Sequence, residues 1–362
     1  MENLLDLYTD YLHVTFRSAT ATGLSNMVDG AVSHDQITRM LSKPAKGSKD
    51  LWLSVKPLVR QHETEDACLI FDDSIIEKPY TDENDLICWH YDHSKNRSVK
   101  GINLLTAFYH TQRADSLPLR VPVGLECVHK PIRYCDLKTR KEKRKSQFTK
   151  NELMRKQIDQ AIQNQLKFKY ILADSWFASA ENMRFIHRKE KYFIFDVKCN
   201  RLVALSDEDR KQGRWTRIDE LPIVEHTPVA VWLKGVDIPL LLVKQIFTNK
   251  DDSTGVRYLI SNDLTLSYER FATLYQKRWG VEEYHKSIKQ NTAVEKSPTR
   301  IIRTQTNHLY AAILAYVKFE RYKFASSLNH FALKTKLYNV AIKAAFKELN
   351  EFKAQFAVEQ PA

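Results

Sequence analysis

The amino-acid sequence predicts a mixed α/β fold flanked by helical regions at both ends. Residues 168–198 read as a strand, a helix and a second strand, which is the pattern of a β-α-β unit. Residues 200–262 contain several short apolar runs that are typical of strands. Residues 1–64 and 296–354 carry apolar side chains at helical spacing.

Residues 1–64 are expected to form an N-terminal helical region that binds DNA. The segment "SHDQITRMLSK" begins with Ser33, a favourable N-cap residue, and repeats apolar residues at helical spacing. A short helix before it and a turn at Asp29–Gly30 would complete a helix-turn-helix. Such a pattern can also form when helices merely pack together, so DNA binding and simple packing are both open at this point.

Residues 65–199 are expected to contain strands that end on acidic residues. "CLIF" is a short buried-strand run that leads into Asp72 and Asp73. "INLLTAFYH" and "LRVPVGLECV" follow as two strands of an antiparallel meander, and a charged helix is expected around "KNELMRKQIDQAIQNQL". The strand in "FKYILADSWFAS" ends on Asp174, and a helix and the strand "YFIFDVK" come next.

The remaining boundaries follow the change from strand to helix patterns. Residues 200–262 form a β-rich insertion, residues 263–295 a long helix that belongs with the first sheet, and residues 296–362 a C-terminal helical region. The helix is expected to run without a break through "SYERFATLYQKRWGVEEYHKSIKQ".

The charge of the chain indicates an acidic partner. Lys and Arg number 56 and Asp and Glu 44, an excess of 12 positive charges, and nucleic acid is the commonest partner for such an excess. The run "KTRKEKRK", Lys138 to Lys145, places six cations in eight residues. Taken alone, this run is equally consistent with a solvated basic loop.

The cysteines and the N-terminal segment indicate where in the cell the protein is expected. Five cysteines without a C-x-x-C pair argue against a disulfide framework or a zinc knuckle and suit a reducing cytoplasm. The segment "MENLLDLYTDYLHVTF" lacks the basic start of a signal peptide, and no apolar run reaches membrane-spanning length. We therefore expect a cytoplasmic protein without a membrane partner, associated with the nucleoid when it is bound to DNA.

Three acidic residues are placed where they could bind metal ions. Asp72 and Asp174 each follow an apolar strand, and Glu282 lies on a helix that could face the rim of the sheet. Three carboxylates can hold two Mg²⁺ ions, which accept phosphate oxygens as further ligands and promote phosphoryl transfer. The alternative is that each strand-terminal Asp only caps a loop or a following helix. The basic composition of the chain favours the chemical interpretation.

The segment "YQKRWGVEEYHKSIKQ" carries a stripe of polar residues. On an uninterrupted helix Tyr275, Arg278, Glu282 and Lys289 fall within roughly 60° of one another, and Lys286 joins them. The alternative is an ordinary amphipathic helix whose exposed face carries Glu–Lys pairs.

This segment resembles the Tyr-x2-Arg-x3-Glu-x6-Lys motif of bacterial insertion-sequence transposases of the DDE superfamily, the Tyr-Arg-Glu-Lys group of the insertion-sequence-four superfamily. All four positions match, and the Arg278–Trp279 pair also resembles members that form DNA hairpins. "LIFDDS" and "YILADSWFAS" resemble the blocks that carry the first and second Asp, with Asp-x-Ser where the family often has Asp-x-Thr. The resemblance covers roughly residues 65–295, in the family's order.

The resemblance implies a fold and a set of ligands. The core would be RNase H-like, interrupted by the β-rich insertion. Asp72, Asp174 and Glu282 would be catalytic and would bind two Mg²⁺ ions, with Mn²⁺ as a substitute. Asp73 is the alternative to Asp72.

The resemblance also implies contacts with DNA. The DNA-binding residues would be Tyr275, Arg278, Trp279, Lys286 and Lys289. Family members also stack a flipped base on a Trp in the insertion, and here Trp215 and Trp232 both remain candidates.

The implied activity is cut-and-paste transposition of an insertion sequence by DNA end cleavage and strand transfer. Its partners would be the terminal inverted repeats, target DNA and a second copy of the chain, which would form a homodimer on paired ends. Two alternatives remain: an inactive transposase-derived DNA-binding protein, and a metal-dependent nuclease without strand transfer.

Overall fold

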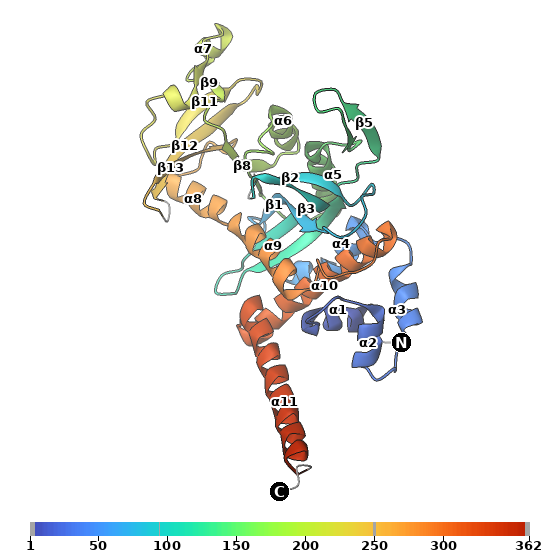
Figure 1. Ribbon diagram of the computed structural model, residues 1–362. Helices are drawn as coiled ribbons and strands as arrows, with labels where there is room; N and C mark the ends of the chain where they lie inside the picture. The colour runs from blue at the N-terminus through green and yellow to red at the C-terminus, as the bar shows by residue number, and fades with distance from the viewer. Residues whose placement is uncertain (1–3, 94, 249–250, 359–362) are drawn as a thin grey trace. The chain divides into compact units, whose positions relative to one another are not determined.

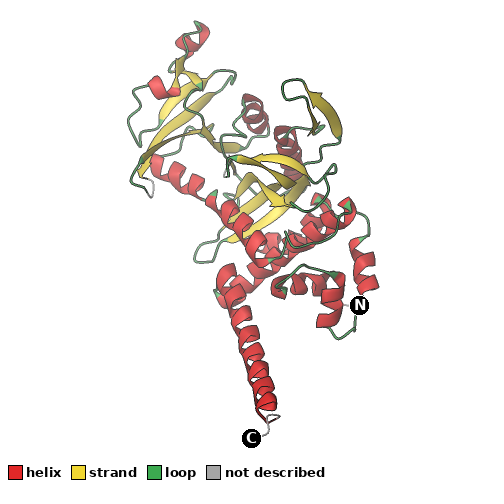
Figure 2. Cartoon of the chain, viewed as in Figure 1, coloured by secondary structure: helices red, strands yellow, loops and turns green. Residues whose placement is uncertain are grey.

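The computed structural model describes residues 4–93, 95–248 and 251–358 (Figure 1). The chain divides into two compact units. One is Gly47–Tyr284, and the other combines Met1–Lys46 with His285–Ala362. Figure 2 shows that the strands belong to the first unit, whereas the second is helical. The division falls within one helix, α9 (Trp279–Asn291).

Within the described residues, one sheet of eleven strands forms the core of the first unit. Its strand order is β10-β9-β11-β12-β13-β8-β7-β1-β3-β2, and β4 also pairs with β3. The strands before the insertion are β1 (Cys68–Glu77), β2 (Cys88–Asp92), β3 (Arg97–Thr111), β4 (Leu119–Cys127), β7 (Tyr170–Ala173) and β8 (Tyr192–Val197). The strands of the insertion are β9 (Leu202–Ala204), β10 (Thr216–Arg217), β11 (Val229–Leu233), β12 (Pro239–Thr248) and β13 (Thr254–Ser261).

The centre of the sheet is parallel and its flanks are antiparallel. β1, β7 and β8 run parallel to one another, and β3 and β13 border them as antiparallel neighbours. The first four residues of β1, Cys68 to Phe71, are completely buried, as expected for a strand covered on both faces. Because β13 pairs with β8, the predicted insertion continues the same sheet.

Helices cover this sheet. They are α4 (Ser48–His62), α5 (Lys150–Gln163), α6 (Ala180–Arg188), α7 (Asp207–Lys211) and α8 (Tyr268–Gln276), with α9 following. Of these, α5, α6, α7 and α8 begin with side-chain caps. α5 begins with a capping box in which Thr149 and Glu152 exchange hydrogen bonds. The Ser48 hydroxyl at the start of α4 donates to the Leu125 carbonyl of β4 at 2.6 Å and so ties this helix to the sheet.

A two-stranded hairpin, separate from the main sheet, contains the basic run. β5 (Ile132–Asp136) pairs with β6 (Lys141–Lys145) in antiparallel register. Most of its side chains are exposed. The sequence patterns did not predict β2, β5 or β6, because β2 is short and the basic residues of the hairpin lack the apolar alternation of a half-buried strand.

The helical unit contains α1 (Leu4–Val14), α2 (Ala21–Met27), α3 (His34–Leu41), α10 (Ile302–Ser326) and α11 (His330–Val358). Ser33 is the N-cap of α3, and its side chain forms a capping box with Gln36, as the sequence predicts. Asp29 and Gly30 adopt positive φ angles in the turn that precedes α3. The helices of the predicted helix-turn-helix therefore exist, and their binding to DNA stays a prediction. In the described ranges no helix is both long and apolar enough to cross a membrane.

Two expectations about local structure are wrong. β1 continues to Glu77 and does not end before Asp72, because the long strand β3 pairs with it as far as Glu77 and Gly101. The expected single helix breaks into α8 and α9 at Lys277 and Arg278. Here successive N–H groups bond to carbonyls three residues earlier, which tightens the backbone for one turn.

His13 anchors α1 in the helical unit. Its ring stacks on Phe319 at a centroid distance of 3.9 Å, and its Nε2 lies 2.9 Å from the carbonyl oxygen of Ala315 on α10. Burial lowers the pKa of His13 to about 4, and the nearby charges of Lys334, Lys318 and His330 act in the same direction. The hydrogen bond to Ala315 opposes this shift without cancelling it. His13 is therefore neutral in the folded state at neutral pH.

This shift predicts acid sensitivity. Below pH 6.5 His13 binds a proton in the unfolded chain but stays neutral in the folded chain. The folded state therefore loses stability as the pH falls towards 4. We expect wild type to lose about 2–3 kcal/mol more than His13→Gln between pH 7 and pH 4. Urea unfolding at both pH values measures this difference, since the other titrating groups are common to the two proteins. Equal pH dependence in both would contradict the assignment.

Candidate active site

The register of the parallel strands brings three aspartates side by side. Phe71 of β1 pairs with Ala173 of β7, and Ala173 pairs with Phe195 of β8. The next residues along the three chains are Asp72, Asp174 and Asp196. Residues at equal register on adjacent strands project from the same face of a sheet. The three carboxylates therefore form a row across the centre of the sheet, the carboxylate row.

The carboxylate row is partly buried, and its members disfavour one another's charge. Burial, together with the negative charges of Asp174 and Asp73, raises the pKa of Asp72 to about 7. Burial also raises the pKa of Asp174, although the Trp176 N–H and Arg278 oppose that shift. The pKa of Asp196 rises to about 6, mainly through burial and with a contribution from Asp174. A cation bound here would relieve this repulsion.

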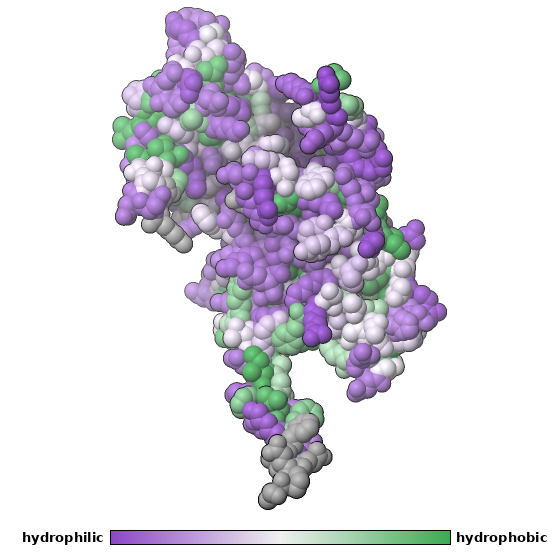
Figure 3. All heavy atoms as spheres, viewed as in Figure 1, coloured by the Kyte–Doolittle hydropathy of each residue, from purple (hydrophilic) through white to green (hydrophobic). Residues whose placement is uncertain are grey.

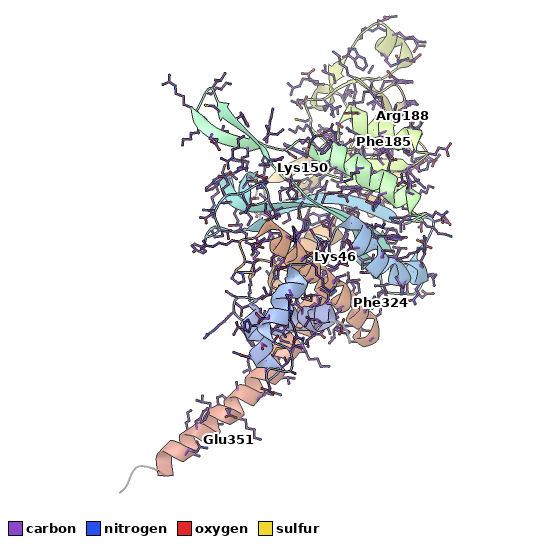
Figure 4. The ribbon with its side chains drawn as sticks, turned by 90° about the vertical axis from the view of Figure 1, so that its right-hand side faces the viewer. Lys46, Lys150, Phe185, Arg188, Phe324 and Glu351 are labelled. Atoms are coloured by element: carbon purple, nitrogen blue, oxygen red, sulfur yellow. The ribbon has the colours of Figure 1, made fainter. Side chains whose placement is uncertain are left out.

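Asp73 lies on the opposite face of β1. Its two oxygens accept hydrogen bonds from Asn103 Nδ2 and from Lys150 Nζ, each at 2.6 Å. Lys150 is the first residue of α5 and is labelled in Figure 4. Asp73 is thus occupied by a lysine and an amide, whereas Asp72 interacts electrostatically with Asp174 and Arg278. Asp72 and Asp73, the two alternatives for the first acid, therefore have different partners, and the choice between them stays a prediction.

Glu282 is held by Arg278 one helical turn earlier. Arg278 Nη2 lies 2.6 Å from Glu282 Oε1, and the Arg278 side chain is only 11% exposed. The neighbouring acidic groups, Tyr275, Glu282 and Asp72, outweigh the effect of burial and raise the pKa of Arg278. This guanidinium therefore interacts electrostatically with members of both acidic groups, the carboxylate row and Glu282.

Tyr275 lies between two arginines. The guanidinium carbons of Arg278 and of Arg257 from β13 are 5.7 Å and 5.6 Å from the centre of its ring. Arg257 Nε also lies 3.8 Å from Asp196 Oδ2. Tyr275 is buried, and burial raises the pKa of its hydroxyl. Arg257 therefore connects Tyr275, a residue of the predicted stripe, to Asp196 of the carboxylate row.

The other predicted residues of the stripe lie on α9. Trp279, at its first position, is 51% exposed. Lys286 Nζ lies 5.2 Å from the centre of the Phe331 ring, and Lys289 is in the last turn. Glu283, the acid next to Glu282, pairs with Arg120 of β4 instead. Adjacent acids on this helix therefore have different arginine partners.

The two tryptophans proposed for base stacking both lie in the insertion beside cations. Trp232 of β11 has the Arg210 guanidinium 4.6 Å from its ring centre, and Trp215 has Lys234 Nζ at 5.9 Å. Neither contact distinguishes one residue from the other as a base-stacking site.

Three residues near the site were missed by the sequence analysis: Asp196, Arg257 and Lys150. The only sequence signal for Asp196 is its position in the second strand of the β-α-β unit, because it follows the start of β8 by as many residues as Asp174 follows the start of β7. Arg257 and Lys150 carry no motif. Their proximity depends on pairing between β13 and β8 and on the packing of α5.

The donor chemistry of the row suits a hard divalent cation. Asp72 and Asp174 offer carboxylate oxygens, the ligands that Mg²⁺ and Mn²⁺ prefer. Among the described residues, however, no group of three His, Cys, Asp or Glu side chains is arranged to hold a metal ion. Glu282 Oε1 accepts a hydrogen bond from Arg278, so an ion bound by Glu282 would have to share this carboxylate with the arginine or displace it.

Comparison with known proteins gives one result that bears on this geometry. Residues 139–318 match the family model described as the transposase DDE domain, and no curated protein matches the chain. The matched range contains Asp174, Asp196, Arg278 and Glu282, whereas Asp72 precedes it. Transposases act on DNA, and DDE domains generally use divalent metal ions. The match supports a DDE transposase domain in this chain.

Proposed function

We propose that this chain is a DNA transposase of the Tyr-Arg-Glu-Lys group that moves an insertion sequence by cut-and-paste transposition. The observation that carries the proposal is the carboxylate row next to the Glu282–Arg278 pair, within a sheet whose second half matches a transposase DDE domain. Its substrates would be the terminal inverted repeats of the element and then target DNA.

We further propose that the core is RNase H-like. The support is the strand order β4-β3-β1-β7-β8, with an antiparallel group followed by parallel strands that a helix connects. In this arrangement the first two acids come from adjacent strands, β1 and the end of β7. Glu282 comes from a helix that follows the insertion.

In this proposal Asp72, Asp174 and Glu282 hold two Mg²⁺ ions, or Mn²⁺ in their place, and Asp196 is a further carboxylate within the row. The bound ions would supply Lewis-acid activation of the attacking oxygen and stabilisation of the leaving oxygen. The residues of the chain supply the negative charge and the fixed spacing. The strand register sets that spacing before DNA binds.

Arg278 has two tasks in the proposal. Without DNA its guanidinium neutralises Glu282 and interacts with Asp72, which keeps the acidic groups compatible. With DNA it contacts a phosphate near the cut, because guanidinium groups bind phosphate oxygens in a bidentate manner. Tyr275 supports it through its ring, and Trp279, Lys286 and Lys289 extend the DNA contact along α9.

A homodimer is proposed on the basis of α11. All residues from Ala341 to Gln355 are exposed, and Figure 3 shows hydrophobic side chains along this helix. Ile342, Ala345, Leu349 and Phe352 follow the alternating three- and four-residue spacing of a coiled-coil seam. In a parallel pair of such helices Glu348 would face Lys353 of the second copy, with opposite charges. The seam is short, so we expect association to depend on paired DNA ends.

The acids give the first test. We expect Asp72→Asn, Asp174→Asn and Glu282→Gln each to slow Mg²⁺-dependent cleavage of the element's ends at least about 100-fold, or about 2.7 kcal/mol. Binding to the same DNA should change little, because each change removes a metal ligand. Cleavage and gel-shift assays on one preparation measure both. Asp73→Asn is the matched control for Asp72, and cleavage abolished only in Asp73→Asn would reverse their roles.

The second test concerns the basic hairpin of β5 and β6. Lys143 and Arg144 pair with acids of the chain, whereas Lys138, Arg140 and Lys141 are exposed. Replacing these three with Gln should flatten the plot of log K for DNA binding against log salt concentration. The slope should change by about 0.9 for each phosphate that the variant no longer neutralises. The control is Lys336→Gln, Lys343→Gln and Lys347→Gln on α11, which removes the same charge. If the hairpin variant and wild type show the same slope, the exposed cations of the hairpin do not contact DNA.

The third test concerns the coiled-coil seam of α11. Ile342→Glu with Leu349→Glu places like charges in the seam and should keep the protein monomeric at concentrations where wild type associates on end DNA. Lys343→Glu with Asn350→Glu adds two acids one position away from the seam and should leave association largely intact. Sedimentation with and without end DNA provides the measurement. Unchanged dimer formation by the seam variant would place the interface elsewhere.

A further inference from the structure

Four aromatic side chains lie exposed on β2, in the turn that follows it and next to Asp174. Trp89 and Tyr91 on β2 are each 54% exposed, and Trp176, two residues after Asp174, is 52% exposed. His93, in the turn after β2, is exposed as well. Large aromatic rings are usually mostly buried, so such a group calls for a partner. These four residues form the aromatic strip.

Ring contacts connect the strip from β2 to Trp176. The ring centres of Tyr91 and His93 are 4.9 Å apart, and those of His93 and Trp176 are 6.2 Å apart. Trp89 and Tyr91 alternate with the buried residues Cys88 and His90, so they share the outer face of β2. β2 is the last strand on its side of the sheet.

Trp176 connects the strip to the proposed catalytic residues. Its backbone N–H donates to Asp174 Oδ1 at 3.0 Å. Through this bond and the two-residue spacing, the start of the strip is fixed relative to Asp174. A chain of DNA held on the strip would therefore lead into the carboxylate row.

Lysines accompany the rings. Lys150 Nζ lies 4.7 Å from the centre of the Trp176 ring, and Lys130 Nζ donates to the carbonyl of Trp89 at 2.7 Å. Lys100 pairs directly with Trp89 across the strands and projects from the same face. A surface that alternates aromatic faces with ammonium groups complements a polymer that alternates flat bases with phosphates. It suits an apolar protein partner less well, because docking would desolvate the lysines.

We propose that the aromatic strip binds unpaired nucleotides of single-stranded DNA by stacking their bases on Trp176 and Tyr91. The inference rests on the proposed function for the source of such DNA, the strands that separate at a cut or distorted end. Base stacking on an aromatic ring is tolerant of sequence, since every base has a flat face. The lysines hold the backbone between the bases.

The test uses full-length protein with EDTA and a fluorescein-labelled twelve-nucleotide oligo(dT), with a blunt duplex of equal length for comparison. We expect Trp176→Ala and Tyr91→Ala each to weaken oligo(dT) binding about 5- to 100-fold, as expected from the stacking of one base. The affinity for the blunt duplex should fall less than about twofold, because paired bases cannot reach the rings. Fluorescence anisotropy measures both affinities.

Two further variants make the result decisive. Trp176→Phe keeps a ring and should retain most of the oligo(dT) affinity. Tyr322→Ala removes an aromatic side chain of similar exposure on α10 and should change nothing. Unchanged oligo(dT) binding in both strip variants would overturn the proposal, and so would equal reductions in affinity for single-stranded and duplex DNA.

This experiment is independent of catalysis. It uses no metal ion and no end sequence, so binding by the strip can be present in a protein that cleaves nothing. Conversely, full oligo(dT) affinity in the strip variants would leave cleavage by Asp72, Asp174 and Glu282 as a separate question. The folded state of each variant is checked by its thermal unfolding midpoint.

Discussion

Repulsion between carboxylates on adjacent parallel strands is the constraint on which the rest of the site depends. Backbone hydrogen bonds between β1, β7 and β8 fix the register, and the register places the backbones of Asp72, Asp174 and Asp196 side by side. The sheet, stabilised by its buried core, thereby holds like charges at close range. Burial adds to this repulsion in raising the pKa values of Asp72 and Asp196, and the positive charges of Arg278 and Arg257 oppose both effects.

The basic residues near the acids form two separate groups. Arg278 and Arg257 enclose Tyr275 on the side of the insertion and helix α8, and they interact with Glu282 and Asp196. Lys150 lies between Asp73 and Trp176, and its charge also opposes the rise in the pKa of Asp174. An ion at Glu282 or at Asp196, or a phosphate at Arg278, would therefore meet an existing ion pair.

The break between α8 and α9 changes how the stripe of polar residues is understood. On one straight helix, Tyr275 and Arg278 would share an exposed face with Glu282. The turn at Lys277 and Arg278 instead buries Tyr275 and brings the Arg278 guanidinium onto Glu282. These three residues still act together, but through contacts across a tight turn. Periodicity cannot reveal such a turn, because the break contains neither Pro nor a cap residue at Lys277 and Arg278.

The sequence by itself determined the order of most elements and the residues that could carry chemistry. Apolar runs located β1, β3, β4, β7 and β8, Ser33 marked the start of α3, and acidic residues next to such runs singled out Asp72 and Asp174. These features are local, so spacing and composition are enough to find them. Only the tertiary structure decided which groups meet. Asp196, Arg257 and the aromatic strip depend on pairing between strands far apart in the chain, and no local pattern encodes that pairing.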